Sequence, residues 1–178
     1  MAVRQIQTET LYWCSVPSVR GICYIFATRY GICWVGTPGT SLEDGIAQTR
    51  RWFRLENITH IGNPLLEKAQ EELHRYFAGE CVQFTCPLDL HGTPFQLLVW
   101  QALTKIPYGK TCSYSEIAQA IGQPKASRAV GAANGANPVP IIVPCHRVIG
   151  RNGTLTGYGS GLPTKSWLLS LEGISHTF

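Results

Sequence analysis

Apolar runs separated by turn residues fill the first part of the chain and predict a meander of three short strands. The runs are Leu11–Val16, Gly21–Ala27 and Gly31–Gly36. Proline, arginine and glycine lie between them, as is typical of strand ends. Each run contains one cysteine, Cys14, Cys23 or Cys33. We expect these three thiols to pack as small hydrophobic side chains.

Two helices are predicted in the rest of the N-terminal half. Ser41 and Asp44 have the S-x-x-D spacing of a capped helix start, so one helix should follow Ser41. A second should begin at Asn63-Pro64 and end at Gly79. Its apolar face is formed by Leu66, Ala69, Leu73 and Tyr76.

The run Thr93-Pro94-Phe95-Gln96 predicts the first helix of a second domain. It combines a capping box with proline at the first helical position. The side chains that this helix should bury are Phe95, Leu98, Val99 and Ala102. We therefore place the domain boundary near His91-Gly92, with domains at residues 1–90 and 91–178.

A short helix, a turn and a second helix follow, which is the helix-turn-helix pattern. Ser113 and Glu116 form a capping box, and the first helix is expected at Glu116–Ile121. The second, at about residues 126–136, carries almost only small residues and a single arginine, Arg128. Such a helix can approach a DNA minor groove closely, whereas a major-groove reader carries long polar side chains. Tight packing against a neighbouring helix is the alternative explanation.

Residues 137–150 carry the strongest chemical signal. Prolines and the apolar run Ile141–Val143 should hold Cys145 on a rigid, extended segment, followed by His146 and Arg147. The imidazole and guanidinium groups are expected to lower the thiol pKa toward the nucleophilic thiolate. Neighbouring residues of an extended strand point to opposite faces, so Cys145 and His146 need a bend or a bridging water to communicate.

Glu172 is the candidate third member of this group. It follows a helix expected at Lys165–Leu171 and capped by Thr164. A carboxylate at a helix C-terminus opposes the macrodipole, and orienting a histidine would offset that cost. A solvated surface charge is the alternative interpretation of Glu172. Between the two motifs lies a loop rich in glycine, whose N–H groups can approach a ligand.

Composition narrows the class of protein. The 178 residues are 44% hydrophobic, which favours a folded globular chain. Residues 1–89 hold 8 basic and 9 acidic side chains, and residues 90–178 hold 7 and 2, so the net charge of +4 belongs to the second half. A basic half favours a polyanionic partner such as nucleic acid, although an ordinary charged surface is the alternative.

The seven cysteines are an odd number and include no C-x-x-C pair. This argues against a disulfide framework and against a zinc ribbon. The sequence has neither a leader pattern at its N-terminus nor an apolar run long enough for a membrane span, so we expect a cytosolic protein with no membrane partner.

The run Pro144-Cys145-His146-Arg147-Val148 resembles the signature of the O6-alkylguanine-DNA alkyltransferases, also called methylated-DNA–protein-cysteine methyltransferases. The resemblance extends over residues 94–173. It includes Phe95–Trp100, Ile106–Gly109, Tyr114, Arg128–Gly131, Asn137-Pro138, Pro140, Gly157-Tyr158, Trp167–Leu169 and Glu172-Gly173.

The resemblance implies an α+β fold with a small, antiparallel N-terminal sheet and helices, ribonuclease H-like, before a mostly helical, winged-helix-like domain with the helix-turn-helix. It implies a protein that flips O6-alkylguanine, and also O4-alkylthymine, out of duplex DNA from the minor groove. The alkyl group would pass irreversibly to Cys145, once per molecule. A monomer without cofactor is expected, in a bacterial-type cytosol or in the nucleus of a eukaryote.

Residue roles also follow from the resemblance. The catalytic group would be Cys145 as acceptor, His146 as base acting through a water, Glu172 orienting the histidine and Asn137 supporting the turn. The DNA-binding group would be Arg128, which fills the gap left by the flipped base, with Tyr114, Ser127, Ala126, Ala129 and Gly131. The guanine pocket would be formed by Tyr114, Pro140, Val148, Tyr158, Gly159 and Ser160.

Two features depart from relatives of this kind. Some members hold a structural zinc in the N-terminal domain, but here the cysteines lie in apolar strands and the nearest histidines are His60, His74 and His91. We therefore predict no metal. The order Gly159-Ser160 replaces the more common Ser-Gly, which bears on tolerance for bulky alkyl groups.

Three other functions compete with this interpretation. A non-catalytic, alkyltransferase-like lesion binder would lack the acceptor, so Cys145 counts against it. In a helix-turn-helix regulator, Cys145 would be incidental. A cysteine hydrolase would turn over repeatedly, whereas a thioether formed on Cys145 offers water no easy leaving group.

Overall fold

The N-terminal sheet has four strands, one more than the sequence predicted. In this computed structural model they are β1 (Thr8–Ser18), β2 (Gly21–Ala27), β3 (Ile32–Val35) and β4 (Arg54–Thr59), in the order β3-β2-β1-β4. β2 pairs antiparallel with both β1 and β3, but β4 pairs parallel with β1. The expectation of an antiparallel sheet is therefore wrong at this edge. A helix lies in the segment between β3 and β4, and such a crossover connection allows β4 to run in the same direction as β1.

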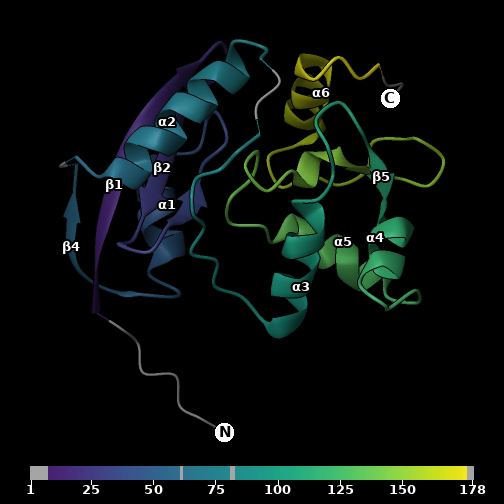
Figure 1. Ribbon diagram of the computed structural model, residues 1–178, viewed down its shortest axis with the longest axis horizontal. Helices are drawn as coiled ribbons and strands as arrows, with labels where there is room; N and C mark the ends of the chain where they lie inside the picture. Colours follow the sequence, from purple (N-terminus) through teal and green to yellow (C-terminus); the bar gives the residue numbers. More distant parts are fainter. Residues whose placement is uncertain (1–7, 61, 81–82, 176–178) are drawn as a thin grey trace, which may run out of the picture. The chain divides into compact units, whose positions relative to one another are not determined.

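The structure describes residues 8–60, 62–80 and 83–175, which divide into two units (Figure 1). The first contains Met1–Ala78 and Phe84–His91, and the second contains Gly79–Gln83 and Gly92–Phe178. The chain thus passes finally into the second unit between His91 and Gly92.

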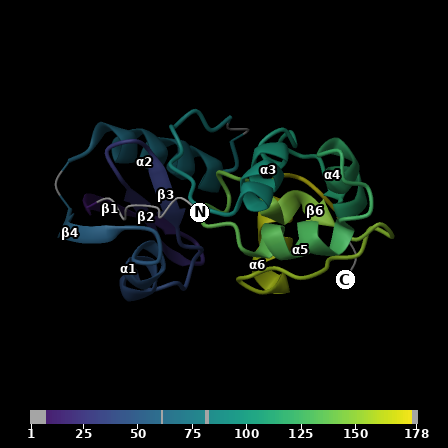
Figure 2. The same ribbon diagram turned by 90° about the horizontal axis from the view of Figure 1, so that it is seen from below.

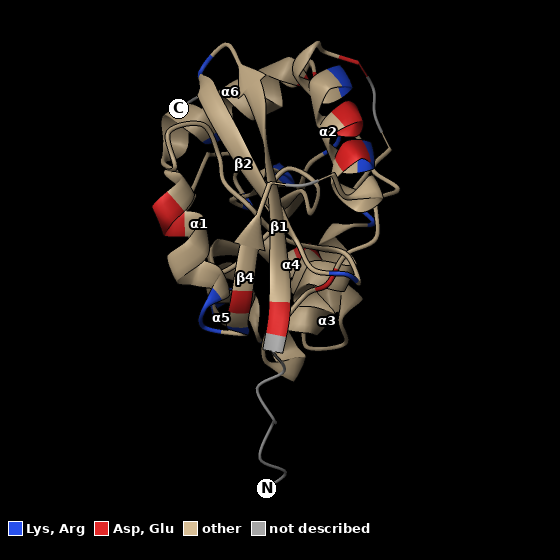
Figure 3. Ribbon diagram, turned by 90° about the vertical axis from the view of Figure 1, so that its left-hand side faces the viewer, with Lys and Arg blue, Asp and Glu red and all other residues tan. Residues whose placement is uncertain are grey.

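Two helices cover the sheet of the first unit, α1 (Leu42–Thr49) on one face and α2 (Pro64–Phe77) on the other (Figure 2). Both begin where the sequence predicted. Ser41 and Asp44 form a complete capping box, and the Asn63 side chain accepts a hydrogen bond from the N–H of Leu65. Acidic residues occupy the first turn of each helix (Figure 3), where their negative charge interacts favourably with the positive end of the helix dipole.

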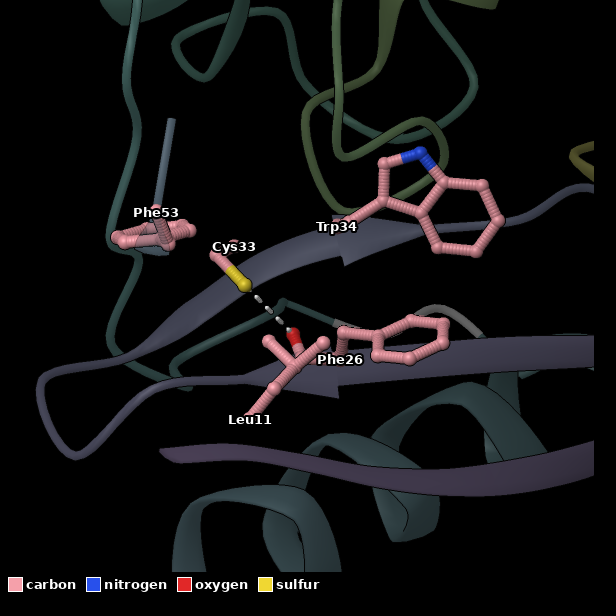
Figure 4. Packing of buried hydrophobic residues seen from close by; sticks show 5 residues of the cluster. All are labelled: Leu11, Phe26, Cys33, Trp34 and Phe53. Atoms are coloured by element: carbon pink, nitrogen blue, oxygen red, sulfur yellow. Dashed lines mark hydrogen bonds between the residues drawn. The ribbon is translucent and has the colours of Figure 1, made fainter. Parts of the chain in front are cut away.

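The side of the sheet that faces α1 carries an apolar cluster formed by Leu11, Phe26, Cys33, Trp34 and Phe53 (Figure 4). The rings of Phe26 and Trp34 meet edge to face, with centroids 5.4 Å apart. Gly45 lets α1 approach them, because a Cβ there would overlap both rings. Cys23 and Cys33 are buried and Cys14 is half-buried, which confirms that these thiols pack among apolar side chains.

The second unit is mostly helical, with a two-stranded parallel pair. Its elements are α3 (Pro94–Leu103), β5 (Cys112–Ser113), α4 (Tyr114–Ala120), α5 (Ser127–Gly135), the 3₁₀ helix η1 (Cys145–Arg147), β6 (Val148–Ile149) and α6 (Leu162–Leu171). Helices α4 and α5 pack against each other and against α3. The predicted capping boxes of Thr93 and Ser113 are both present.

Three expectations about the helices of this unit need correction. Helix α3 buries Val99, Trp100 and Leu103, while Leu98 is 38% exposed, so its buried stripe is rotated from the predicted one. Indole Nε1 of Trp100 donates to the Ala133 carbonyl at 2.8 Å, which gives this large side chain a polar partner inside the unit. Helix α4 begins at Tyr114, two positions before the predicted start.

The third correction concerns α6. Thr164 does not cap it, because the helix begins earlier, after Gly161 with its positive φ of 82°. Within the described residues, no helix is both long and apolar enough to cross a membrane.

Candidate active site

The segment before Cys145 is a tight turn held by one amide side chain. Asn137 Nδ2 donates to the Val143 carbonyl at 2.8 Å, and Asn137 Oδ1 accepts from the N–H of Val139 at 3.0 Å. Inside the turn, the fully buried Ile141 has a φ of 76°, a strained value for a β-branched residue. The turn therefore fixes the backbone that leads into the cysteine.

Cys145 opens the 3₁₀ helix η1 and does not lie on an extended strand, so that expectation is corrected. The chain bends at this 3₁₀ turn, so the two side chains are not constrained to opposite faces of a strand. Cys145 is 3% exposed. Its carbonyl accepts a hydrogen bond from Asn134 Nδ2 of α5 at 3.2 Å, which ties the predicted DNA-binding helix to the cysteine.

His146 and Glu172 meet in the interior, although 26 positions separate them in the chain. The distance between His146 Nε2 and Glu172 Oε1 is 2.8 Å, and both side chains are fully buried. An ionised carboxylate only accepts, so Nε2 carries the hydrogen and Nδ1 is the basic nitrogen of the neutral ring. This contact contradicts the alternative of a solvated surface charge for Glu172.

The carboxylate of Glu172 is also bound by a guanidinium. Arg147 Nε lies 2.9 Å from Oε2 and Arg147 Nη2 lies 2.9 Å from Oε1, while the N–H of Gly109 donates to Oε2 at 3.1 Å. The remaining arm of Arg147 donates to the Ile106 carbonyl at 2.7 Å. These donors offset the unfavourable position of a carboxylate at the C-terminal end of α6.

The pKa values follow from burial and from these partners. Burial raises the pKa of Cys145, and contacts with Asn137, Lys165 and Tyr158 oppose that rise. The prediction that the imidazole of His146 and the guanidinium of Arg147 lower this thiol pKa is wrong, because burial raises it and the contacts that oppose burial come from other residues. Arg147 is bound to Glu172. Burial lowers the pKa of His146 in spite of Glu172. The site at rest is therefore a neutral thiol beside a neutral imidazole.

Glu172 itself stays ionised. Burial alone would raise its pKa, but the hydrogen bonds from His146 and Arg147 outweigh burial and lower it to about 2. The carboxylate can therefore orient His146 and stabilise an imidazolium without taking the proton itself.

A buried lysine lies at the same centre and was not among the predicted site residues. Lys165 Nζ donates to the Val148 carbonyl at 2.6 Å and to the Thr156 carbonyl at 2.8 Å. Burial lowers its pKa to about 8, against the favourable interaction with Cys145. In the sequence, its only signal is that it is the one charged residue of this helix.

An open hollow of about 570 Å³ lies beside this centre, between α4, α5 and the glycine-rich loop. It is lined by Tyr114, Ser127, Arg128, Gly131, Gly135, Thr156, Gly157 and Tyr158. The Tyr114 hydroxyl lies 3.4 Å from the Thr156 carbonyl, and a Cβ at Gly131 would lie 3.7 Å from the Tyr114 ring. Five predicted DNA or pocket residues thus line one hollow.

The other predicted residues lie elsewhere in the unit. Val148 is buried behind the cysteine, and Pro140 is half-buried in the turn. Ala129, Gly159 and Ser160 are exposed, and Ala126 is half-buried. Among the described residues, no three His, Cys, Asp or Glu side chains gather as metal ligands.

The chain is similar to known proteins of one family. It is 54% identical over 123 residues to the constitutive methylated-DNA–protein-cysteine methyltransferase of Bacillus subtilis (strain 168), covering 68% of this chain and 74% of that protein. It is 46% identical over 163 residues to the inducible protein of the same name and organism, covering 92% and 90%. The chain belongs to the methylated-DNA–protein-cysteine methyltransferase family.

The family profile described as 6-O-methylguanine DNA methyltransferase, DNA binding domain, matches residues 94–174. This range contains Cys145, His146, Glu172 and every residue that lines the hollow. Among methyltransferases of known structure, the Mycobacterium tuberculosis O6-methylguanine methyltransferase is 42% identical with a TM-score of 0.76, covering 91% of this chain and 92% of that one.

The M. tuberculosis OGT in complex with DNA is also similar. It is 41% identical with a TM-score of 0.74, covering 90% of this chain and 92% of that chain.

Proposed function

We propose that this chain repairs DNA by direct reversal, taking the alkyl group from O6 of guanine onto Sγ of Cys145 and being consumed in one turnover. The observation that carries the proposal is the buried connection from the Cys145 turn through His146 to Glu172, with its 2.8 Å contact. The names of the relatives describe transfer of a methyl group from methylated DNA to a protein cysteine.

Each residue of this site has a role in the proposed reaction. His146 Nδ1 takes the thiol proton through a bridging water, and the imidazolium is stabilised by Glu172. The Cys145 thiolate attacks the alkyl carbon, an S–C bond forms, and the C–O6 bond breaks with its electron pair going to the guanine. The guanine then takes up a proton, so that overall the thiol proton is exchanged for the alkyl group. Asn137 holds the turn that aims Sγ.

DNA is proposed to bind at α4 and α5 from the minor groove. Small residues at the start of α5 allow close approach, namely the N-cap Ala126 and Ser127, Ala129 and Gly131 of the helix itself. The exposed Arg128 fills the gap left by the flipped base. Flipping costs a few kcal/mol, which this wedge and a pocket must offset. Positions 90–178 hold 7 basic and 2 acidic residues, and this positive charge favours contacts with DNA phosphates.

The flipped base is proposed to enter the hollow beside Tyr114 and Tyr158. A part for Pro140, Val148, Gly159 and Ser160 in the pocket stays a prediction from the family resemblance. O4-alkylthymine is a second substrate by the same chemistry. We further propose a cytosolic monomer without cofactor, a ribonuclease H-like first unit and a winged-helix-like second unit.

The experiment uses duplex DNA with a labelled methyl group on O6 of one guanine. We expect covalent label on the protein that stops at one equivalent, and Cys145→Ala should lose the label but still bind DNA. DNA binding without label by the unaltered protein would favour a lesion binder or a regulator, and release of more than one equivalent of product would favour a hydrolase.

A further inference from the structure

Three arginines without a counter-charge lie close together in the first unit. They belong to the run Arg-Arg-Trp-Phe-Arg at residues 50–54, here called the arginine segment, which joins the end of α1 to β4 (Figure 3). Arg50, Arg51 and Arg54 are exposed, and no carboxylate among the described residues forms an ion pair with any of them. The next acidic residue along the chain, Glu56, is itself exposed on β4. The positive charge of this segment is therefore open to a ligand.

The arginine segment is an ordered part of the fold. The main-chain N–H groups of residues 50–53 all donate to carbonyls of α1, at 3.0–3.2 Å. Phe53 is buried in the apolar cluster beside α1, and Arg54 begins β4, where it pairs with Thr8 of β1. Because the backbone is held at both ends, a ligand that binds here has little backbone entropy to overcome.

Trp52 places an accessible aromatic ring among these charges. Its side chain is 38% exposed, and its ring centroid lies 6.2 Å from that of His91. Phe53, directly after it, takes the position in the core. Guanidinium groups match the geometry of phosphates, and aromatic rings pack against nucleotides, so arginines around an exposed tryptophan are suited to a nucleic-acid strand.

Helix stability explains only one of the three arginines. Arg50 is the C-cap residue of α1, where a positive charge interacts favourably with the helix dipole. Arg54 lies on a strand, and no such interaction applies to it. Like charges that are close together without a counter-charge repel one another, so the folded state alone gains little from this grouping. Bound phosphates would supply the missing negative charge.

We propose that the arginine segment is a second DNA-contacting surface, on the first unit: Arg50, Arg51 and Arg54 bind backbone phosphates, and Trp52 packs against the strand between them. This inference rests on the proposed function for the identity of its ligand. The second unit contains the match to the DNA-binding family profile, at residues 94–174. Once that unit holds DNA, the attached first unit meets phosphates at a high effective concentration, so weak contacts add to the affinity. Phosphate contacts carry no sequence information, so this surface acts on undamaged DNA as well.

The test measures binding of a long, unmodified DNA duplex over a series of salt concentrations, by fluorescence anisotropy. The variant combines Arg50→Gln, Arg51→Gln and Arg54→Gln. The slope of log K against log salt should become shallower by about 2 to 3, because each lost phosphate contact removes about 0.9 from it. At low salt the variant should bind at least about tenfold more weakly than the unaltered protein, and this difference should shrink as salt is added.

Two further variants separate local contact from net charge. Arg20→Gln, Lys68→Gln and Arg75→Gln together remove three exposed positive charges from the same unit outside the arginine segment. This matched control should change the slope by less than about 1. Trp52→Ser should weaken binding by about fivefold or more and leave the slope unchanged, because packing against a strand releases no counterions.

The outcomes separate this inference from the function beneath it. Equal slopes for the two triple variants would overturn the role of the arginine segment, as would a slope within about 0.5 of that of the unaltered protein. The proposed function is decided by methyl transfer, which this binding test does not use: an unaltered protein that binds DNA but accepts no methyl group overturns that function alone. Should circular dichroism show that the triple variant is unfolded, Arg51→Gln alone decides, with an expected change in slope of about 0.9.

Discussion

His146 Nε2 lies 2.8 Å from Glu172 Oε1 in a site that excludes solvent from both side chains. The carboxylate is held from its other side by Arg147 and Gly109, so it cannot rotate away from the histidine. This arrangement fixes the tautomer of His146 and leaves Nδ1 as the atom that takes a proton. The reactive cysteine therefore depends on a charge far along the chain.

Replacing Glu172 by glutamine should slow methyl transfer roughly a hundredfold to a thousandfold, because the imidazolium loses its counter-charge while the shape of the site is kept. The measurement is single-turnover transfer from methylated duplex DNA. The control is Glu56→Gln, which neutralises an exposed carboxylate on β4. Equal rates for both variants would contradict the role of Glu172.

Glu172 should also make the free energy of unfolding depend on pH in the acid range. The folded state lowers the Glu172 pKa from 4.5 to about 2, so its ionised form contributes stability above about pH 4.5 that is lost as the pH falls toward 2. The contribution is roughly 3 kcal/mol. Urea unfolding should show a gap between the unaltered protein and Glu172→Gln that narrows from pH 5 downward. A gap that stays constant with pH would contradict this.

Arg128→Ala should separate base flipping from chemistry. We expect transfer from duplex DNA to slow by about tenfold or more, since the wedge that offsets unstacking is gone. Transfer from free O6-methylguanine base should not change. Arg151→Ala removes the charge of another exposed arginine and controls for weaker phosphate contact. Equal losses on duplex and free base would refute the wedge.

Local signals predicted most helices of this fold. Ser41, Asn63, Thr93 and Ser113 all cap helices as expected, because a cap is decided by residues within one turn. Strand β4 was missed because its residues Arg54–Thr59 are mostly polar and show no apolar alternation. Its strand conformation depends on pairing with β1, a partner distant in the sequence.

The sequence was enough to predict which residues form the candidate active site, but not all of the contacts that they make. The order of Cys145 and His146 and the place of Glu172 after a helix were enough to propose a nucleophile, a base and an orienting group. Arg147 was expected to act on the Cys145 thiol and Lys165 was given no role, because lysine and arginine are rarely buried and the sequence does not show where a buried one finds its partners. Their partners, the carbonyls of Ile106 and Thr156, are main-chain groups that carry no sequence signal.

The most direct test of the account is mass spectrometry of the intact protein after reaction with excess DNA containing O6-methylguanine, followed by peptide mapping. We predict one methyl group per molecule in place of one hydrogen, carried by the peptide that contains Cys145, and an unmodified mass for Cys145→Ala. An unmodified protein, or a methyl group on any other residue, would contradict the assignment of Cys145 as the acceptor.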